Sequence, residues 1–346
     1  MKSGKSGVKL KFLDQSEEIS MIPLGYARLI AYGDLAVTPP QKLAYASSSV
    51  NRRIENDSQI LFPTSVVYDE SPVGHLEFAL RHEGVNLEVI DAAFDFIEPK
   101  ELIARLKATP TGEHIRRACF LWEWLTDKSL DTEVTIKVGY VDLFPTDLYY
   151  TAAEPVRTPK FRVRDNALGT RYFCPIVRRA AIPDDPPLTD LLREAQSMLD
   201  AMDDPELYRR ALNFLYLSDT RGSYAIESET PSSDKQERFV HLLKRAGEAA
   251  EVNEEWLVQL QNVVVRDVQS GSVVSHEAEL AGECDRTHRL FPAPVGDLRE
   301  VMQAWERFVN DQKRCPDVFV KAACAAFGFV YLRIRFWMAT GGCIAF

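Results

Sequence analysis

The feature that most constrains the fold is a run of residues, 316–332, that is apolar on almost every side. Its first residue, Pro316, suits the first turn of an α-helix, where the missing N–H of proline leaves no bond unmade. A helix that is apolar all round is buried, because no side of it favours contact with water. We therefore expect residues 316–332 to form a central helix that other helices surround.

The segment that follows this helix, 333–346, has no clear period and no capping signal. A change of reading frame would explain the pattern. With permitted codons, reading from the third base of the Arg333 codon gives His-Pro-Phe-Leu-Asp-Gly-Asn-Gly-Arg-Leu-His-Arg-Phe. Trp337 and Met338 have one codon each, so the Asp-Gly pair of this reading is forced, and the other residues need only allowed third bases. The alternative is an ordinary divergent segment in its proper frame.

The shifted reading resembles the signature of the Fic (Fido) family, H-P-F-x-x-G-N-G-R-x-x-R. A second stretch, Ser223-x-x-x-Glu227, resembles the inhibitory motif of Fic proteins, [S/T]-x-x-x-E-[G/N], although Ser228 stands where Gly or Asn is usual. From spacing, Ser223 is expected to cap a short helix, and Glu227 projects from the same face one turn later. A capped turn on a solvated helix is the alternative for this stretch.

The resemblance implies a protein adenylyltransferase with self-inhibition. In the family, the signature's His is the general base that takes a proton from a target hydroxyl, which attacks the α-phosphate of ATP and leaves AMP on the protein. An acidic residue after Phe holds Mg²⁺, and Gly-Asn-Gly brings backbone N–H groups to the phosphates. The inhibitory Glu pairs with the last Arg of the signature and obstructs the γ-phosphate. The resemblance therefore assigns inhibition to Ser223 and Glu227, and a target-binding flap to Arg266, Gln269, Ser270 and Gly271.

The chain departs from the family at the residues that carry the chemistry. None of its six histidines is followed by Pro-Phe, so no residue can be named the catalytic base, the Mg²⁺ carboxylate or the phosphate-binding arginine. We therefore expect a chain that is truncated at the catalytic loop and inactive, and the same departure puts binding of ATP and Mg²⁺ in doubt. A non-catalytic remnant or a protein-binding module is the alternative. No metal site is expected, because Cys284-x-x-x-His288 lacks a second pair of ligands.

The first half of the chain mixes helical and strand patterns. Turn clusters separate short apolar runs over residues 20–80, and apolar residues at helical spacing then predict helices at 87–97, 100–107 and 113–125. Two β-branched runs, at 134–144 and within 161–177, predict a small hairpin sheet. Proline and aspartate concentrate at 181–187, where the strand pattern gives way to helices.

We therefore predict two domains, an N-terminal α+β extension with short hairpins at 1–183 and a Fic-type helical domain at 184–346. The fold class is mainly α. Further helices are expected at the following ranges: 188–202, 205–217, 236–250, 253–265 and 296–310. The last of these would precede the central helix.

Charge and composition exclude several classes of protein. The net charge of −10 argues against a general nucleic-acid binder or a protein of anionic membrane surfaces. No uncharged apolar run approaches the ~20 residues of a membrane span, and the N-terminus lacks the apolar segment of a signal peptide. Six scattered cysteines predict reduced thiols in a cytoplasm rather than a disulfide framework. The partner is expected to be an unidentified target protein, with a homo-oligomer as a further possibility.

Overall fold

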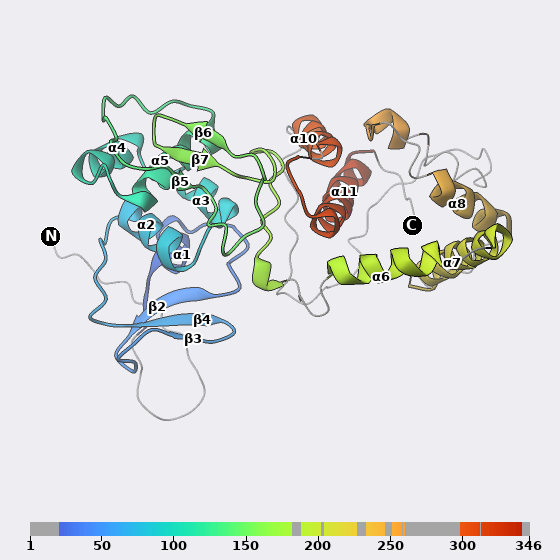
Figure 1. Ribbon diagram of the computed structural model, residues 1–346. Helices are drawn as coiled ribbons and strands as arrows, with labels where there is room; N and C mark the ends of the chain where they lie inside the picture. Colours follow the sequence, from blue (N-terminus) through green and yellow to red (C-terminus); the bar gives the residue numbers. More distant parts are fainter. Residues whose placement is uncertain are drawn as a thin grey trace. The chain divides into compact units, whose positions relative to one another are not determined.

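The computed structural model describes residues 21–181, 188–201, 204–226, 233–245, 251–257, 259, 298–311 and 313–340, and these fall into two compact units (Figure 1). The described part of the first unit is 21–144 with 155–166. The second unit contains 145–154, 167–181 and the described segments from 188 onward. Residues 167–181, which precede the predicted boundary at 183, thus belong to the same unit as the C-terminal helices.

The first unit begins with a four-stranded sheet in the order β1-β2-β4-β3. Its strands are β1 (Met21–Pro23), β2 (Leu43–Ser47), β3 (Ile54–Glu55) and β4 (Gln59–Pro63). The two central strands, β2 and β4, run parallel, and the outer strands pair with them antiparallel. Parallel pairing joins segments that a short turn cannot connect.

The described part of this unit also contains five helices: α1 (Gly25–Gly33), α2 (Pro72–His82), α3 (Leu87–Ala93), α4 (Pro99–Ala108) and α5 (Glu113–Thr126). The sequence signals explain several of their ends. Ser71 caps α2 by accepting a hydrogen bond from the Gly74 N–H at 3.0 Å, and Pro72 occupies the first turn. The helix predicted at 113–125 is confirmed, whereas α3 ends four residues before the predicted residue 97.

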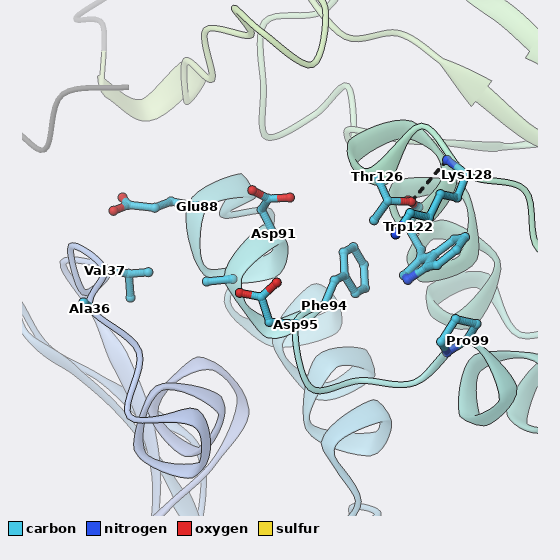
Figure 2. A pocket seen from close by; sticks show the side chains of 11 residues that line it. Ala36, Val37, Glu88, Asp91, Phe94, Asp95, Pro99, Trp122, Thr126 and Lys128 are labelled. Carbon is cyan, nitrogen blue, oxygen red and sulfur yellow. Dashed lines mark hydrogen bonds between the residues drawn. The ribbon is translucent and has the colours of Figure 1, made fainter. Parts of the chain in front are cut away.

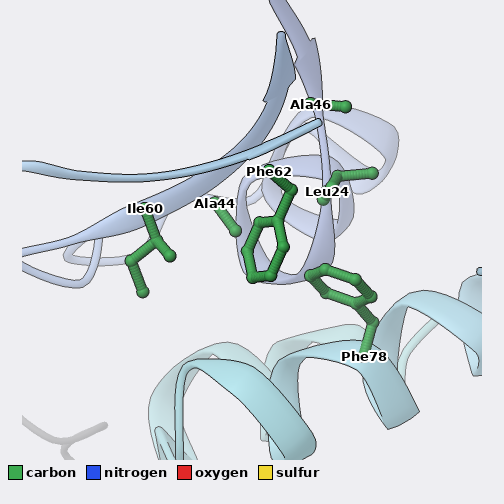
Figure 3. Close-up of a cluster of buried hydrophobic side chains, with 6 residues drawn as sticks. All are labelled: Leu24, Ala44, Ala46, Ile60, Phe62 and Phe78. Atoms are coloured by element: carbon green, nitrogen blue, oxygen red, sulfur yellow. The ribbon is translucent and has the colours of Figure 1, made fainter. Parts of the chain in front are cut away.

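The core between α2 and the sheet follows from strand alternation (Figure 3). Ala44 and Ala46 of β2 lie opposite Ile60 and Phe62 of β4, so alternate residues of both strands face the helix. The small alanines leave room for the larger partners. Phe78 of α2 contacts the ring of Phe62 edge-on, with 5.1 Å between ring centroids.

A buried carboxyl group fixes the start of α1. Glu83 is 7% exposed, and its Oε1 accepts a hydrogen bond from the Tyr26 N–H at 3.0 Å. This bond satisfies one of the N–H groups that a helix leaves unpaired at its N-terminus. Burial raises the pKa of Glu83 to about 8. Gly25 has φ +50, and a Cβ there would collide with this carboxyl group, so the position requires glycine.

The predicted hairpin sheet is present in a different form. Strand β5 covers only Val141–Asp142 of the run at 134–144, and it pairs parallel with β7 (Val163–Asp165). The antiparallel partner of β7 is instead β6 (Val156–Thr158). The expectation that the two runs form one hairpin is therefore wrong. Strand propensity marks strands but does not choose their partners.

The described helices of the second unit are α6 (Leu188–Asp200), α7 (Pro205–Ile226), α8 (Ser233–Arg245), α10 (Leu298–Asn310) and α11 (Val318–Thr340). The chain as described is thus mainly helical, with small sheets and an N-terminal α/β region. None of the helices in these described segments is both long enough and apolar enough to cross a membrane.

Two helices of this unit are longer than predicted. Helix α7 continues past residue 217 to Ile226, and the Thr220 hydroxyl donates to the Tyr216 carbonyl at 2.7 Å, as in a helix interior. Helix α11 continues past residue 332 to Thr340. No proline or glycine interrupts 333–340, so a segment without a hydrophobic period still extends the helix.

Candidate functional site

The predicted catalytic loop would follow the apolar part of α11, so the packing of this helix determines what could be positioned there. Helix α11 packs along α10 on one side only, because Val318 and Phe327 are 72% and 63% exposed, so the expectation of a helix surrounded on all sides is wrong. Trp305 of α10 is 3% exposed, and its indole N–H donates to the Ala325 carbonyl of α11 at 2.9 Å. The rings of Trp305 and Phe329 are 5.7 Å apart. A hydrogen bond and a ring contact thus fix one helix against the other.

Close approach at this contact depends on Gly328. A Cβ on Gly328 would lie 2.5 Å from the Phe173 ring and 2.6 Å from Cδ1 of Trp305. Both distances are far below a normal carbon–carbon contact of about 3.5 Å. Glycine is therefore required here by packing, because its φ is that of an ordinary helix.

The start of α11 is anchored by charged side chains. Asp317 caps the helix, since its Oδ1 accepts hydrogen bonds from the N–H groups of Phe319 at 3.0 Å and Val320 at 2.9 Å. Lys321 donates to the Asp311 carbonyl at 2.9 Å, just beyond the end of α10. Arg314 donates to the Gly169 carbonyl at 3.0 Å. The connection between the two helices is thereby tied to the loop around residue 169.

Two cysteines lie in the apolar cluster beneath this connection. Cys315 and Cys324 are buried with Leu168, Phe308 and Val320. Burial raises the pKa of both thiols, that of Cys324 to about 11. A thiol needs its thiolate form to act as a nucleophile or as a metal ligand, so both cysteines are core residues.

A cavity of about 500 Å³ lies beside α10 in the second unit. Its polar side chains are largely engaged in holding neighbouring backbone. Asn310 bonds to both the N–H and the carbonyl of Val252, at 2.8 and 2.7 Å, and Glu306 accepts from the Glu254 N–H at 2.7 Å. These side chains hold the neighbouring backbone in place and are not free to bind a ligand. We therefore assign the cavity no chemistry.

The structure tests only part of the predicted inhibitory motif. Ser223 lies in the last turn of α7, so the expectation that it caps a short separate helix is wrong. The residues between 217 and 223 contain no proline, and the helix therefore has no reason to stop. Glu227 and the four predicted flap residues lie outside the described part of the chain, namely Arg266, Gln269, Ser270 and Gly271.

The residues at the predicted place supply no carboxylate for Mg²⁺. Mg²⁺ in proteins is held by carboxylate oxygens, and α11 and the residues after it contain no Asp or Glu. The positions that would carry the catalytic base and its neighbours are Arg333, Ile334 and Arg335. Within the described ranges, no cluster of three or more His, Cys, Asp or Glu could hold a metal ion.

A second cavity, of about 490 Å³, lies in the first unit, and the sequence patterns did not predict it (Figure 2). Its lining includes Asp91 of α3, Asp95 just after α3, and Trp122 of α5. The spacing of the two aspartates by one helical turn was a signal in the sequence. No signal in the sequence shows that these aspartates and Trp122 line the same cavity, because they come together only when α3 and α5 pack against each other.

Comparisons of the chain with protein-family models, with curated proteins and with solved structures found no match.

Proposed function

We propose that this polypeptide comes from a gene for a self-inhibited, Fic-type protein adenylyltransferase, and that the chain itself transfers no AMP. The observation that carries this proposal is the shifted reading of residues 333–346. Within it, the single codons of Trp337 and Met338 force an Asp-Gly pair at the two places where the signature needs an Mg²⁺ ligand and its first glycine. An unrelated segment has no reason to satisfy the signature in a second frame.

The place of the shifted reading along the chain supports the same proposal. It begins directly after the apolar part of α11, which Trp305 and Asp317 hold in position. In the shifted reading a proline follows the histidine, and proline disfavours helical conformation in the residue before it. The helix would therefore end near Leu332, and the loop after it would stand on a fixed helix. Catalytic loops need such a rigid support.

The chemistry of the restored loop is absent from the chain as it stands. A histidine that titrates near neutrality suits removal of a proton from a target hydroxyl, and arginine suits the phosphate charge. In this chain Arg333 occupies the histidine position, and a guanidinium stays protonated and cannot act as a base. The chain therefore lacks the proton acceptor that AMP transfer to a hydroxyl requires.

The first experiment sequences the gene and compares two proteins. One is the chain as it stands, and the other removes the first two bases of the Arg333 codon, so that Leu332 is followed by His-Pro-Phe. With ATP labelled at the α-phosphate, we expect incorporation of label only in the second protein. Replacement of its new histidine by alanine is the control and should abolish labelling. No labelling of the restored protein under any condition would contradict the proposal.

The inhibitory role is tested in the restored protein by Glu227→Gly. Removal of the carboxylate frees the arginine with which it pairs and opens the γ-phosphate position, so self-labelling should rise at least about tenfold, as expected for loss of a charge-assisted contact. Glu229→Gly removes a neighbouring carboxylate outside the motif and should leave labelling unchanged. Equal effects of the two substitutions would remove the inhibitory assignment from Glu227.

A protein-binding module is the second candidate, and exposed apolar side chains favour it. Met198 of α6 is 60% exposed and Phe214 of α7 is 71% exposed. Surfaces of this kind are covered by another protein or by a second copy. Sedimentation of the chain should then depend on concentration, and Phe214→Asp should reduce the association more than Ser218→Asp on the same helix. A monomer at all concentrations would count against a second copy as the partner.

A further inference from the structure

One face of the small sheet β5-β7-β6 carries a row of charged side chains (Figure 1). Asp142 of β5 lies opposite Arg164 of β7, and Arg164 lies opposite Arg157 of β6, so the three side chains share one face. Asp142 accepts two hydrogen bonds from Arg164, at 2.6 and 2.9 Å. The carboxylate of this row therefore pairs with Arg164, and Arg157 faces a like charge.

Two arginines without a counter-ion meet at one aromatic ring. The guanidinium carbon atoms of Arg157 and Arg162 lie 5.8 and 5.2 Å from the centre of the Tyr140 ring. Within the described part of the chain, neither guanidinium group forms an ion pair or a hydrogen bond. The ring attracts both cations, but it does not neutralise them. Two permanent positive charges are thus held together with no carboxylate to balance them.

A buried arginine of α5 fixes this arrangement from below. Arg116 is 3% exposed, and its Nη1 donates to the Gly139 carbonyl at 3.0 Å and to the Arg162 carbonyl at 3.3 Å. The Arg162 carbonyl also accepts from the Val141 N–H at 3.0 Å. The residues before and after Tyr140 are therefore tied to the backbone of Arg162, which keeps the ring and this guanidinium together.

The backbone of Arg162 provides an independent sign that its side chain binds something. Arg162 ends the turn between β6 and β7, and its φ is +52. This left-handed conformation favours glycine, because a Cβ there crowds the neighbouring carbonyl oxygen. Non-glycine residues held in this conformation gather at ligand-binding and active sites. An arginine in a place that suits glycine therefore indicates a role for the guanidinium group outside the fold.

We propose that Arg157 and Arg162, positioned by Tyr140, bind the phosphate group of a phosphomonoester. Such a group carries nearly two negative charges at neutral pH, which match the two unpaired guanidinium groups. The planar fork of N–H groups on each arginine fits phosphate oxygens. A long polyanion such as a nucleic acid would meet the net charge of −10 of the chain, whereas one phosphate group meets only the local charges. The site lies wholly within the first unit and does not depend on AMP transfer.

Calorimetry of the full chain with phenyl phosphate tests the proposal. At about 50 mM salt we expect a Kd of about 1 mM, as two charge-assisted contacts provide. Phenyl sulfate has the same ring and shape but a single negative charge, so it should bind about tenfold more weakly. A pentapeptide with phosphoserine between four glycines separates two sources of the group. Binding at least about tenfold tighter than that of phenyl phosphate identifies a phosphorylated protein segment, and weaker binding identifies a small phosphomonoester.

Matched variants separate the site from general charge effects and from the fold. Arg157→Gln should weaken binding of phenyl phosphate about tenfold, whereas Arg81→Gln removes an exposed arginine of α2 in the same unit and should have no effect. Arg162→Gly should also weaken binding about tenfold, yet its urea midpoint should be unchanged or higher, because glycine relieves the left-handed backbone. Tyr140→Ala should weaken binding about threefold and Tyr140→Phe, which keeps the ring, should not.

Four results would overturn the proposal. They are no saturable binding of phenyl phosphate or of the peptide, equal binding of phenyl sulfate, equal effects of Arg157→Gln and Arg81→Gln, and a lower urea midpoint for Arg162→Gly. The last result would show that the Arg162 side chain supports the fold rather than a ligand.

Discussion

Because α10 and α11 lie close together, we predict that replacing glycine by alanine has opposite effects on the free energy of unfolding at two positions. Gly222 lies inside α7, and a Cβ there would meet nothing within 4 Å. Gly328 lies inside α11, where a Cβ would meet the Phe173 ring at 2.5 Å and Trp305 at 2.6 Å. Replacing either glycine by alanine gains the same helix propensity, about 1 kcal/mol. Only Gly328→Ala adds a collision.

The magnitude of that collision follows from what can move. Trp305 is held by its bond to Ala325, and Phe173 packs against Phe308 with ring centroids 5.4 Å apart. Trp305 is buried and Phe173 is partly buried, so at least one packed ring has to shift, and insertion of a methyl group costs about 1–3 kcal/mol. We therefore expect Gly222→Ala to stabilise the chain by about 1 kcal/mol and Gly328→Ala to destabilise it by up to about 2 kcal/mol.

The assay is urea unfolding followed by circular dichroism and by tryptophan fluorescence. The helix-propensity gain is common to both variants, so the difference between their free energies of unfolding isolates the collision. Phe173→Leu removes ring atoms and should rescue Gly328→Ala more than it rescues Gly222→Ala. If Gly328→Ala were as stabilising as Gly222→Ala, the packing described for α10 and α11 would be refuted.

Two further predictions concern single side chains. Burial, and after it the Arg28 charge, lowers the pKa of His75 to about 4, and its side chain is 3% exposed. This histidine is neutral in the folded state, so the stability present above pH 6.5 is lost as the pH falls towards 4, by at most about 3 kcal/mol. His75→Leu should flatten that part of the pH profile in urea titrations; an unchanged slope would assign the acid sensitivity to other groups. Asp317→Ala should lower the free energy of unfolding by about 1 kcal/mol through loss of the α11 cap, whereas Asp317→Asn, which still accepts, should lose much less.

The elements that the sequence predicts well are those with signals inside a few residues. Helix α5 follows from apolar spacing, and α10 ends at the predicted residue 310. The coarse class, mainly helical with an N-terminal α/β region, is also confirmed. Capping and periodicity act between neighbours in the chain, so they can be recognised without the rest of the molecule.

The elements that the sequence predicts poorly depend on distant partners or on the absence of a stop signal. The run at 134–144 contributes only β5, because Val163 supplies its parallel partner across twenty residues of intervening chain. The helix through Ser223 continues because no residue ends it, although a cap signal is present. Local patterns identify residues that can cap or pair, and tertiary contacts decide which of them do.

For the proposed function, the argument rests on the sequence alone, since it depends on the codons that residues 333–346 permit. Only the tertiary structure provided the cavity of Asp91, Asp95 and Trp122 and the need for glycine at 328. The physical reason is the same for the cavity and for Gly328. A cavity and a close helix contact exist only when segments far apart in sequence meet, and no local pattern of residues encodes the space between them.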